Sequence, residues 1–200
     1  DFYAAQIFKE TPVMIGWLNM WDRNIPYSKY GFAGMLTLPR KICVKKGRLF
    51  QKPLFKGRRV KDLRAREVYD NASTGVIEIS VRNLKSLRLE LRKKDGMQTV
   101  ITADKAQLTF DRSMSGEPIV GKETDALSLA GLRKLPLDSR QKHTVTVVTD
   151  LFSVEIFVDG KALSSAVCPD PDADGIVMQC NADSCRYVRY DLSDYMKITD

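Results

Sequence analysis

Residues 143–158, with the sequence HTVTVVTDLFSVEIFV, decide the fold class of this 200-residue chain. Polar and apolar side chains alternate in both halves of the stretch, which is the period of a β-strand with one buried face. The second half places four apolar side chains on one face, namely Phe152, Val154, Ile156 and Val158. Asp159-Gly160 follows as a turn into a further strand. The stretch therefore predicts a β-hairpin.

The same alternation recurs on both sides of this hairpin. Two earlier runs each place three aliphatic side chains on one face: Ile77, Ile79 and Val81 in residues 76–81, and Leu87, Leu89 and Leu91 in residues 86–92. Further strands are predicted at residues 97–102, 106–110, 161–167, 175–180 and 185–191. About ten strands between residues 70 and 192 predict an all-β fold with two packed sheets and few helices.

The N-terminal residues have a different character. Short apolar strands are predicted at residues 12–19 and 33–38. Between them lies WDRNIPYSKYG, and long loops rich in aromatic and polar residues often form binding surfaces. The chain is therefore predicted to have two parts, residues 1–52 and residues 53–200.

The segment at the junction of the two parts carries turn and breaker residues. Residues 51–66 contain Pro53, Gly57 and a basic run, which predicts a linker into the second part. Within this segment, the run DLRAREV at residues 62–68 is predicted to form one or two helical turns.

Composition and charge bound the class of protein. Hydrophobic residues make up 44% and charged residues 28%, the balance of a soluble globular chain. No apolar run approaches the roughly 20 residues needed to cross a bilayer, so no membrane partner is predicted. The net charge is +7, but the basic cluster at residues 56–66 lacks interleaved aromatics and that at 92–94 ends a strand. A solvated basic surface is favoured over nucleic-acid binding.

The first residues, Asp1-Phe2-Tyr3, include neither an initiator Met nor a signal-peptide pattern. The chain is therefore expected to begin inside a larger fold. Both a cytoplasmic and a secreted location stay open.

No metal or cofactor site is predicted. The four cysteines show no CxxC or Cys/His spacing of a zinc site. Cys180 and Cys185 flank a predicted hairpin loop at disulfide distance, and whether they are oxidised stays open. An acidic run before Gly175 is similar to a calcium loop, but Asn181 stands at its twelfth position instead of Glu, so an acidic turn is favoured. His143, the only histidine, is expected to be a surface or hydrogen-bonded residue.

An ordered series of motifs runs along nearly the whole chain. Its members are DFYAAQ at residues 1–6, IGWLNMW at 15–21, GMLTLPR at 34–40, LTFDRSMSG at 108–116 and SVEIFV at 153–158. Together they resemble glycoside hydrolase family 32, which contains invertases, inulinases, levanases and sucrose-6-phosphate hydrolases. The resemblance implies a five-bladed β-propeller followed by a β-sandwich, with residues 1–52 as the last strands of the propeller.

The resemblance also implies an activity. The parent protein would hydrolyse terminal β-fructofuranosyl bonds in sucrose or fructans by a retaining mechanism without a cofactor, using two carboxyl groups roughly 5 Å apart. The family's WMNDPNG-like, Arg-Asp-Pro and Glu-Cys motifs, which carry the catalytic groups, do not occur here, so no catalytic residue is assigned. The missing propeller portion of the same protein is the predicted partner.

Three residues match positions near the family's fructosyl subsite, namely Asp1, Tyr3 and Trp17. They imply a carboxylate that accepts hydroxyl hydrogen bonds and an aromatic face that stacks on the ring. For Trp17, a core aromatic within a propeller blade is an equal alternative. Lys41 and Phe32 depart from the family pattern, which usually has Glu and Trp there.

A second hypothesis is that the sandwich is a carbohydrate-binding module without catalytic activity of its own. It requires an exposed aromatic platform, for which the candidates are Tyr187, Tyr190 and Phe157.

Overall fold

The computed structural model describes residues 1–122 and 131–192, and within these ranges the chain is nearly all β. The last residues of the predicted second part, 193–200, lie outside the described residues. The strands are β1 Tyr3–Ile7, β2 Val13–Trp17, β3 Arg40–Lys45, β4 Arg48–Pro53, β5 Arg58–Leu63, β6 Glu67–Asn71, β7 Gly75–Arg82, β8 Ser86–Lys94, β9 Met97–Ala103, β10 Gln107–Asp111, β11 Leu132–Pro136, β12 Lys142–Asp150, β13 Ser153–Val158, β14 Lys161–Ala166, β15 Gly175–Asn181 and β16 Ser184–Asp191, and a 3-10 helix covers Pro26–Tyr30.

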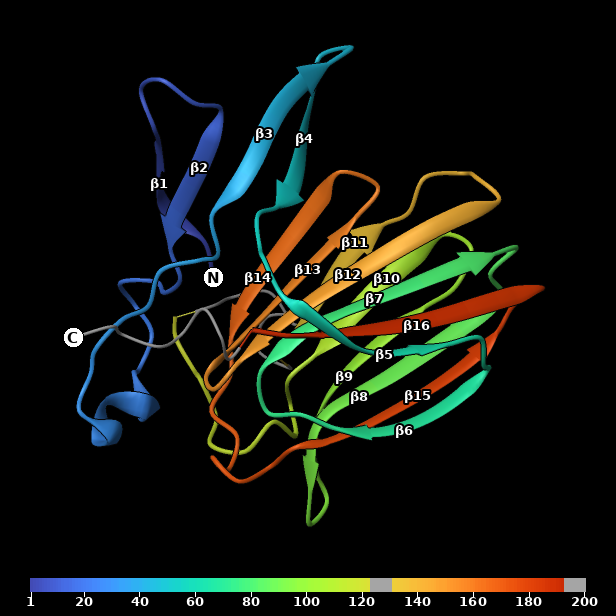
Figure 1. Ribbon diagram of the computed structural model, residues 1–200. Coiled ribbons are helices and arrows are strands. Elements are labelled where there is room, and N and C mark those ends of the chain that lie inside the picture. Colours follow the sequence, from blue (N-terminus) through green and yellow to red (C-terminus); the bar gives the residue numbers. More distant parts are fainter. Residues whose placement is uncertain (123–130, 193–200) are drawn as a thin grey trace.

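The strands form three antiparallel sheets (Figure 1). A four-stranded sheet has the order β1-β2-β3-β4, as in one blade of a propeller. Two six-stranded sheets have the orders β11-β10-β9-β8-β15-β6 and β14-β13-β12-β7-β16-β5. These two sheets pack on one another, which confirms the predicted β-sandwich.

The core lies between the two six-stranded sheets. The faces predicted from alternation point into it: the aliphatic side chains of β7 and β8 named above are at most 3% exposed. Val147 and Ile156 lie opposite one another in the predicted β12–β13 hairpin, and both are fully buried. Alternation at a period of two therefore identified the buried face correctly.

The predicted linker and helical turns at residues 51–66 and 62–68 are wrong. Residues 58–63 form β5, which pairs with β16, and residues 67–71 form β6, which pairs with β15. Only residues 54–57 connect the blade to the sandwich. Both β5 and β6 are edge strands, so each is held by hydrogen bonds to one neighbouring strand only. Because few of their side chains are buried, their sequences alternate only weakly between polar and apolar residues.

The predicted strand at residues 33–38 is reduced to a single bridge between Leu36 and Trp17. Thr37 N donates to Gly16 O at 2.9 Å, and Leu18 N donates to Met35 O at 2.8 Å. Gly34 has a φ of +97°, which lies outside the strand region, so the pairing does not extend toward residue 33.

The loop between Cys180 and Cys185 is not a hairpin, contrary to prediction. It carries the chain from β15 in one sheet to β16 in the other. Both thiols are free, 7% exposed and part of the sandwich core. The hydrogen bond between them raises the pKa of Cys185, and burial acts in the same direction.

No helix in the described residues is long and apolar enough to cross a membrane.

Candidate functional site

Three aromatic rings of the blade form an open cluster. Tyr3 and Trp17 are directly opposite one another in the β1–β2 pair, and their ring centroids are 6.2 Å apart. Trp21, just beyond β2, lies 5.0 Å from Trp17 and 6.4 Å from Tyr3. Tyr3 is 44% exposed and Trp21 is 79% exposed, so the cluster presents ring surface to solvent. The structure thus brings together two of the three predicted site residues.

Backbone geometry holds the indole of Trp17 in place. A Cβ added to Gly34 would lie 2.8 Å from Trp17 Nε1, and Gly34 has a positive φ, so only glycine lets the backbone come this close. On the opposite face of β2, Gly16 packs against the ring of Phe2. Trp17 is half-buried, whereas Met14, Gly16 and Leu18 are buried, so its side chain is not on the fully buried face of the strand.

Asp1, the third predicted site residue, has a carboxylate that is 1% exposed and joins blade to sandwich. Its Oδ1 forms an ion pair with Arg23 at 2.8 Å, and its Oδ2 forms one with Arg112 at 2.6 Å. Oδ2 also accepts from the backbone N–H of Ala166 at 3.0 Å. The carboxylate is therefore neutralised by two guanidinium groups from distant segments, and its contact with a sugar stays a prediction.

Arg112 has partners far from its own turn, while its neighbour Asp111 forms a hydrogen bond within it. Asp111 Oδ1 accepts from Ser113 N at 2.8 Å, which closes the turn. Arg112 points away and donates to Ala166 O at 2.9 Å in addition to its pair with Asp1. No local sequence signal links residues 1 and 112, because their proximity depends on how the two parts of the chain pack.

A second buried ion pair joins the two parts and was also missed. Arg40 at the start of β3 pairs with Glu155 of β13, and their side chains are 2% and 4% exposed. Ser164 Oγ donates to Glu155 at 2.7 Å, and Leu38 N donates to the other carboxylate oxygen. Burial raises the pKa of Glu155, while the guanidinium of Arg40 opposes that shift. The guanidinium also lies over the rings of Phe2 and Phe157.

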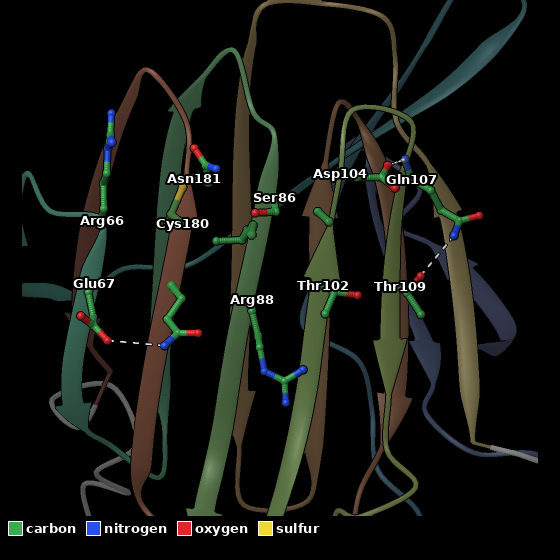
Figure 2. A pocket seen from close by; sticks show the side chains of 13 residues that line it. Arg66, Glu67, Ser86, Arg88, Thr102, Asp104, Gln107, Thr109, Cys180 and Asn181 are labelled. Carbon is green, nitrogen blue, oxygen red and sulfur yellow. Dashed lines mark hydrogen bonds between the residues drawn. The ribbon is translucent and has the colours of Figure 1, made fainter.

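A polar groove of about 570 Å³ crosses the outer face of the sheet that contains β8 and β15 (Figure 2). Its lining includes the side chains of Glu67, Arg88, Thr102, Asp104 and Gln107. Glu67 Oε1 accepts from Tyr69 at 2.6 Å, and Asp104 Oδ1 accepts from two backbone N–H groups at 2.8 Å each. These hydrogen bonds lower the pKa of both carboxyl groups.

The groove does not have the geometry of a glycosidase centre. Glu67 lies on β6 and Asp104 follows β9, so β15 and β8 separate them. Neighbouring strands are about 4.8 Å apart, which places the two carboxyl groups on the order of 14 Å from each other. A retaining pair requires roughly 5 Å. The lining of this groove also contains no aromatic ring on which a sugar would stack.

The aromatic platform required by a carbohydrate-binding module is not formed by its three candidates. Tyr187 is fully buried and Phe157 is 3% exposed. Tyr190 packs edge-on against Phe55, and its hydroxyl donates to Glu78 at 2.9 Å.

The remaining polar candidates have structural partners. His143 Nδ1 lies 3.0 Å from Asp159 Oδ2, so the histidine is hydrogen-bonded as expected. Asp170 pairs with Lys94 at 2.9 Å and accepts from Asp172 N, which supports the acidic-turn interpretation. In residues 1–122 and 131–192, no three His, Cys, Asp or Glu side chains are grouped as metal ligands.

Comparison with known proteins agrees with this architecture. The profile described as "Glycosyl hydrolases family 32 N-terminal domain" matches residues 1–53, and "Glycosyl hydrolases family 32 C terminal" matches residues 55–193. The sucrose-6-phosphate hydrolase of Staphylococcus xylosus is 30% identical over 220 residues, covering 96% of this chain and 42% of the relative. The raffinose invertase of Escherichia coli is 28% identical, covering 86% of this chain and 38% of the relative.

Solved structures share the fold. The exo-inulinase of Aspergillus awamori superposes with a TM-score of 0.72 at 23% identity, covering 96% of this chain and 43% of that protein. The fructan 1-exohydrolase IIa of Cichorium intybus superposes with a TM-score of 0.72 at 14% identity, covering 96% of this chain and 48% of that protein. The chain spans 37% to 42% of the length of three curated relatives that it matches. With the C-terminal profile matching more than half of its residues and the N-terminal profile matching those before, the chain belongs to glycoside hydrolase family 32.

Proposed function

We propose that this chain is part of a β-fructofuranosidase that hydrolyses terminal β-fructofuranosyl bonds in sucrose or fructans. The open cluster of Tyr3 and Trp17 carries the proposal, because it offers ring surface to a sugar on the blade of a family 32 chain. Relatives are named for sucrose-6-phosphate, raffinose and levan, and one neighbouring structure holds sucrose. Sucrose or a fructan is therefore the substrate class we propose.

The division of labour within the protein follows from the side chains. The residues described here supply the wall of the fructosyl pocket, with Trp17 stacking on the ring and Tyr3 beside it. We propose that a sugar hydroxyl donates to Asp1 Oδ1, which requires Arg23 to move aside because the carboxylate is 1% exposed. The nucleophile and the acid/base carboxyl group would come from further propeller blades of the same protein, which are the partner of this chain. The sandwich, residues 53–200, packs on residues 1–52 and stabilises them.

The test is Trp17→Ala in the complete enzyme. We expect kcat/KM for sucrose to fall about tenfold or more, and Trp17→Phe to recover part of it, because stacking needs an aromatic face. Tyr69→Ala is the matched control, since Tyr69 is an exposed aromatic on the sandwich. Unchanged kcat/KM in Trp17→Ala would argue against the pocket. Release of fructose by the 200-residue chain alone would contradict the proposed division of labour.

A further inference from the structure

The β3–β4 hairpin carries an uncompensated positive charge. No Asp or Glu occurs between Asp22 and Asp62, so the hairpin contains no acidic residue. Lys41 and Lys52 lie directly opposite one another in its antiparallel register. Like charges opposite one another on a sheet destabilise it, so this pair requires an explanation outside the hairpin.

The lysines face a cavity between blade and sandwich. The cavity measures about 500 Å³, and its wall includes Lys41, Lys45 and Lys52 on one side and Thr144 and Thr146 of β12 on the other. This volume lies within the usual range for a small-molecule site.

The hairpin lies beside the turn between β13 and β14 and is anchored to it (Figure 1). Gln51 N donates to Gly160 O at 2.8 Å. Phe50 packs so closely on Gly160 that an added Cβ would lie 2.2 Å from its ring. The lysine-bearing wall is therefore anchored to the sheet that it faces.

Charges around the cavity do not balance. Lys41, Lys45 and Lys52 are all exposed. None of them pairs with a carboxylate of the described residues. Of the two acidic residues in the wall, Asp159 pairs with Arg140 at 3.6 Å and faces His143 at 3.0 Å, and Glu78 accepts from the neutral Tyr190 hydroxyl. Three lysines therefore face two carboxylates, and neither carboxylate pairs with a lysine. The basic strand β5 differs, because its cations have Asp62, Asp70 and Asp191 as partners.

We propose that this cavity binds a small organic phosphate. Lysine ammonium groups bind phosphate as point charges, and three of them around one cavity match a dianion better than a single carboxylate. Thr144 also lines the cavity, and its hydroxyl lies 3.4 Å from that of Ser80. The site lies between β4 and the sandwich, and it does not depend on the proposed fructosidase activity.

Cys43 provides a built-in reporter. It lines the same cavity, lies between Lys41 and Lys45 on β3, and is exposed, whereas the other three cysteines are buried. The rate of its reaction with dianionic 5,5′-dithiobis(2-nitrobenzoate), divided by its rate with neutral N-ethylmaleimide, measures the local positive potential. The experiment uses the 200-residue chain, with circular dichroism and a thermal melt of each variant to compare folding.

Glucose 6-phosphate is expected to slow labelling by the dianion about tenfold at saturation, while glucose has no effect. Lys52→Gln and Lys41→Gln should each raise the half-protecting concentration about tenfold, the loss expected for one charge-assisted contact. Lys105→Gln is the matched control, since Lys105 is an exposed lysine in the turn after β9. It should change protection less than about twofold.

Inorganic phosphate separates the sources of the ligand chemistry. Protection by inorganic phosphate equal to that by glucose 6-phosphate would assign the site to the phosphate group alone. Stronger protection by the sugar phosphate would assign it to the whole molecule. Equal protection by sodium chloride at the same ionic strength, or no change in the reagent ratio in Lys41→Gln and Lys52→Gln, would overturn the proposal.

Discussion

At the scale of single residues, buried carboxylates with several cationic partners set how stability depends on pH. Asp70, which is 7% exposed, pairs with Lys61 and Arg189 at 2.8 Å each, and it accepts from the Tyr187 hydroxyl at 3.1 Å. Burial alone would raise the pKa of Asp70, but the bonds from Lys61, Asn71 N and Arg189 lower it overall. A lowered pKa means that the folded state binds fewer protons than the unfolded state near that pH.

Asp70→Asn should therefore lower the free energy of unfolding by about 2 kcal/mol at pH 7. The contribution of Asp70 is present above its ordinary pKa of 3.8 and is lost as pH falls through the lower folded value. Urea unfolding from pH 7 to pH 2.5 should show the two proteins converging. Asp95→Asn, in an exposed turn, is the control and should stay within about 0.5 kcal/mol of the wild type. A difference that does not shrink at low pH would contradict the assignment.

The same scale shows which site residues a sequence can predict. Tyr3 and Trp17 were predicted because they stand in recognisable motifs, and the structure places their rings together. Arg112 and Glu155 also stand in motifs, but their partners are Asp1 and Arg40, more than 100 residues away. A single sequence does not specify which distant charge a buried residue will meet, because many pairings satisfy the same composition.

At the scale of elements, two turns with matching backbones differ in their surroundings. Lys46-Gly47 joins β3 to β4 and Asp159-Gly160 joins β13 to β14, and all four residues have a positive φ, as in a type I′ turn. A Cβ at Gly47 would meet nothing within 4 Å, whereas one at Gly160 would clash with Phe50.

Gly47→Ala should cost about 1 kcal/mol, the penalty of a left-handed backbone for alanine. Gly160→Ala should cost about 1–3 kcal/mol more, because the ring of Phe50 must move. Chemical denaturation of both variants measures the difference between their free energies of unfolding. This difference is the cost of the clash with Phe50, because the backbone strain is common to both variants. In a Phe50→Ala background the extra cost should disappear; if it persists, contact with Phe50 is not its source.

Elements were predicted well where burial is strong and poorly where it is weak. The strands β7, β8, β12 and β13 bury one face in the core, so their alternation is regular and their positions were predicted. The edge strand β5 has no buried aliphatic stripe, since five of its six residues are exposed. Its conformation follows from pairing with β16, which a local pattern does not encode.

At the scale of the whole molecule, the blade and the sandwich are joined by buried charges, and this sets how they unfold. Breaking a buried ion pair by removing one partner typically costs about 3–5 kcal/mol, because the remaining charge is left uncompensated. Arg40 and Glu155 form such a pair across the junction. Both tryptophans of the chain, Trp17 and Trp21, lie in the blade, so tryptophan fluorescence reports on the blade alone. Far-UV circular dichroism reports mainly on the sandwich, which holds twelve of the sixteen strands in residues 1–122 and 131–192.

In the wild type, the two signals should change together in urea, since the blade packs on the sandwich through Asp1, Arg40 and Phe50. Glu155→Gln leaves Arg40 buried without its charge partner, so fluorescence should change at lower urea than circular dichroism. Glu90→Gln is the control. It removes a carboxylate that pairs with Arg88 on the same strand, β8, so fluorescence and circular dichroism should still change together. Coincident transitions in Glu155→Gln would mean that the remaining contacts, among them the Asp1–Arg112 ion pair and the packing of Phe50, suffice to couple the two parts. Replacing both partners, Arg40→Met with Glu155→Leu, should bring the signals back together, because no uncompensated charge then remains at the junction.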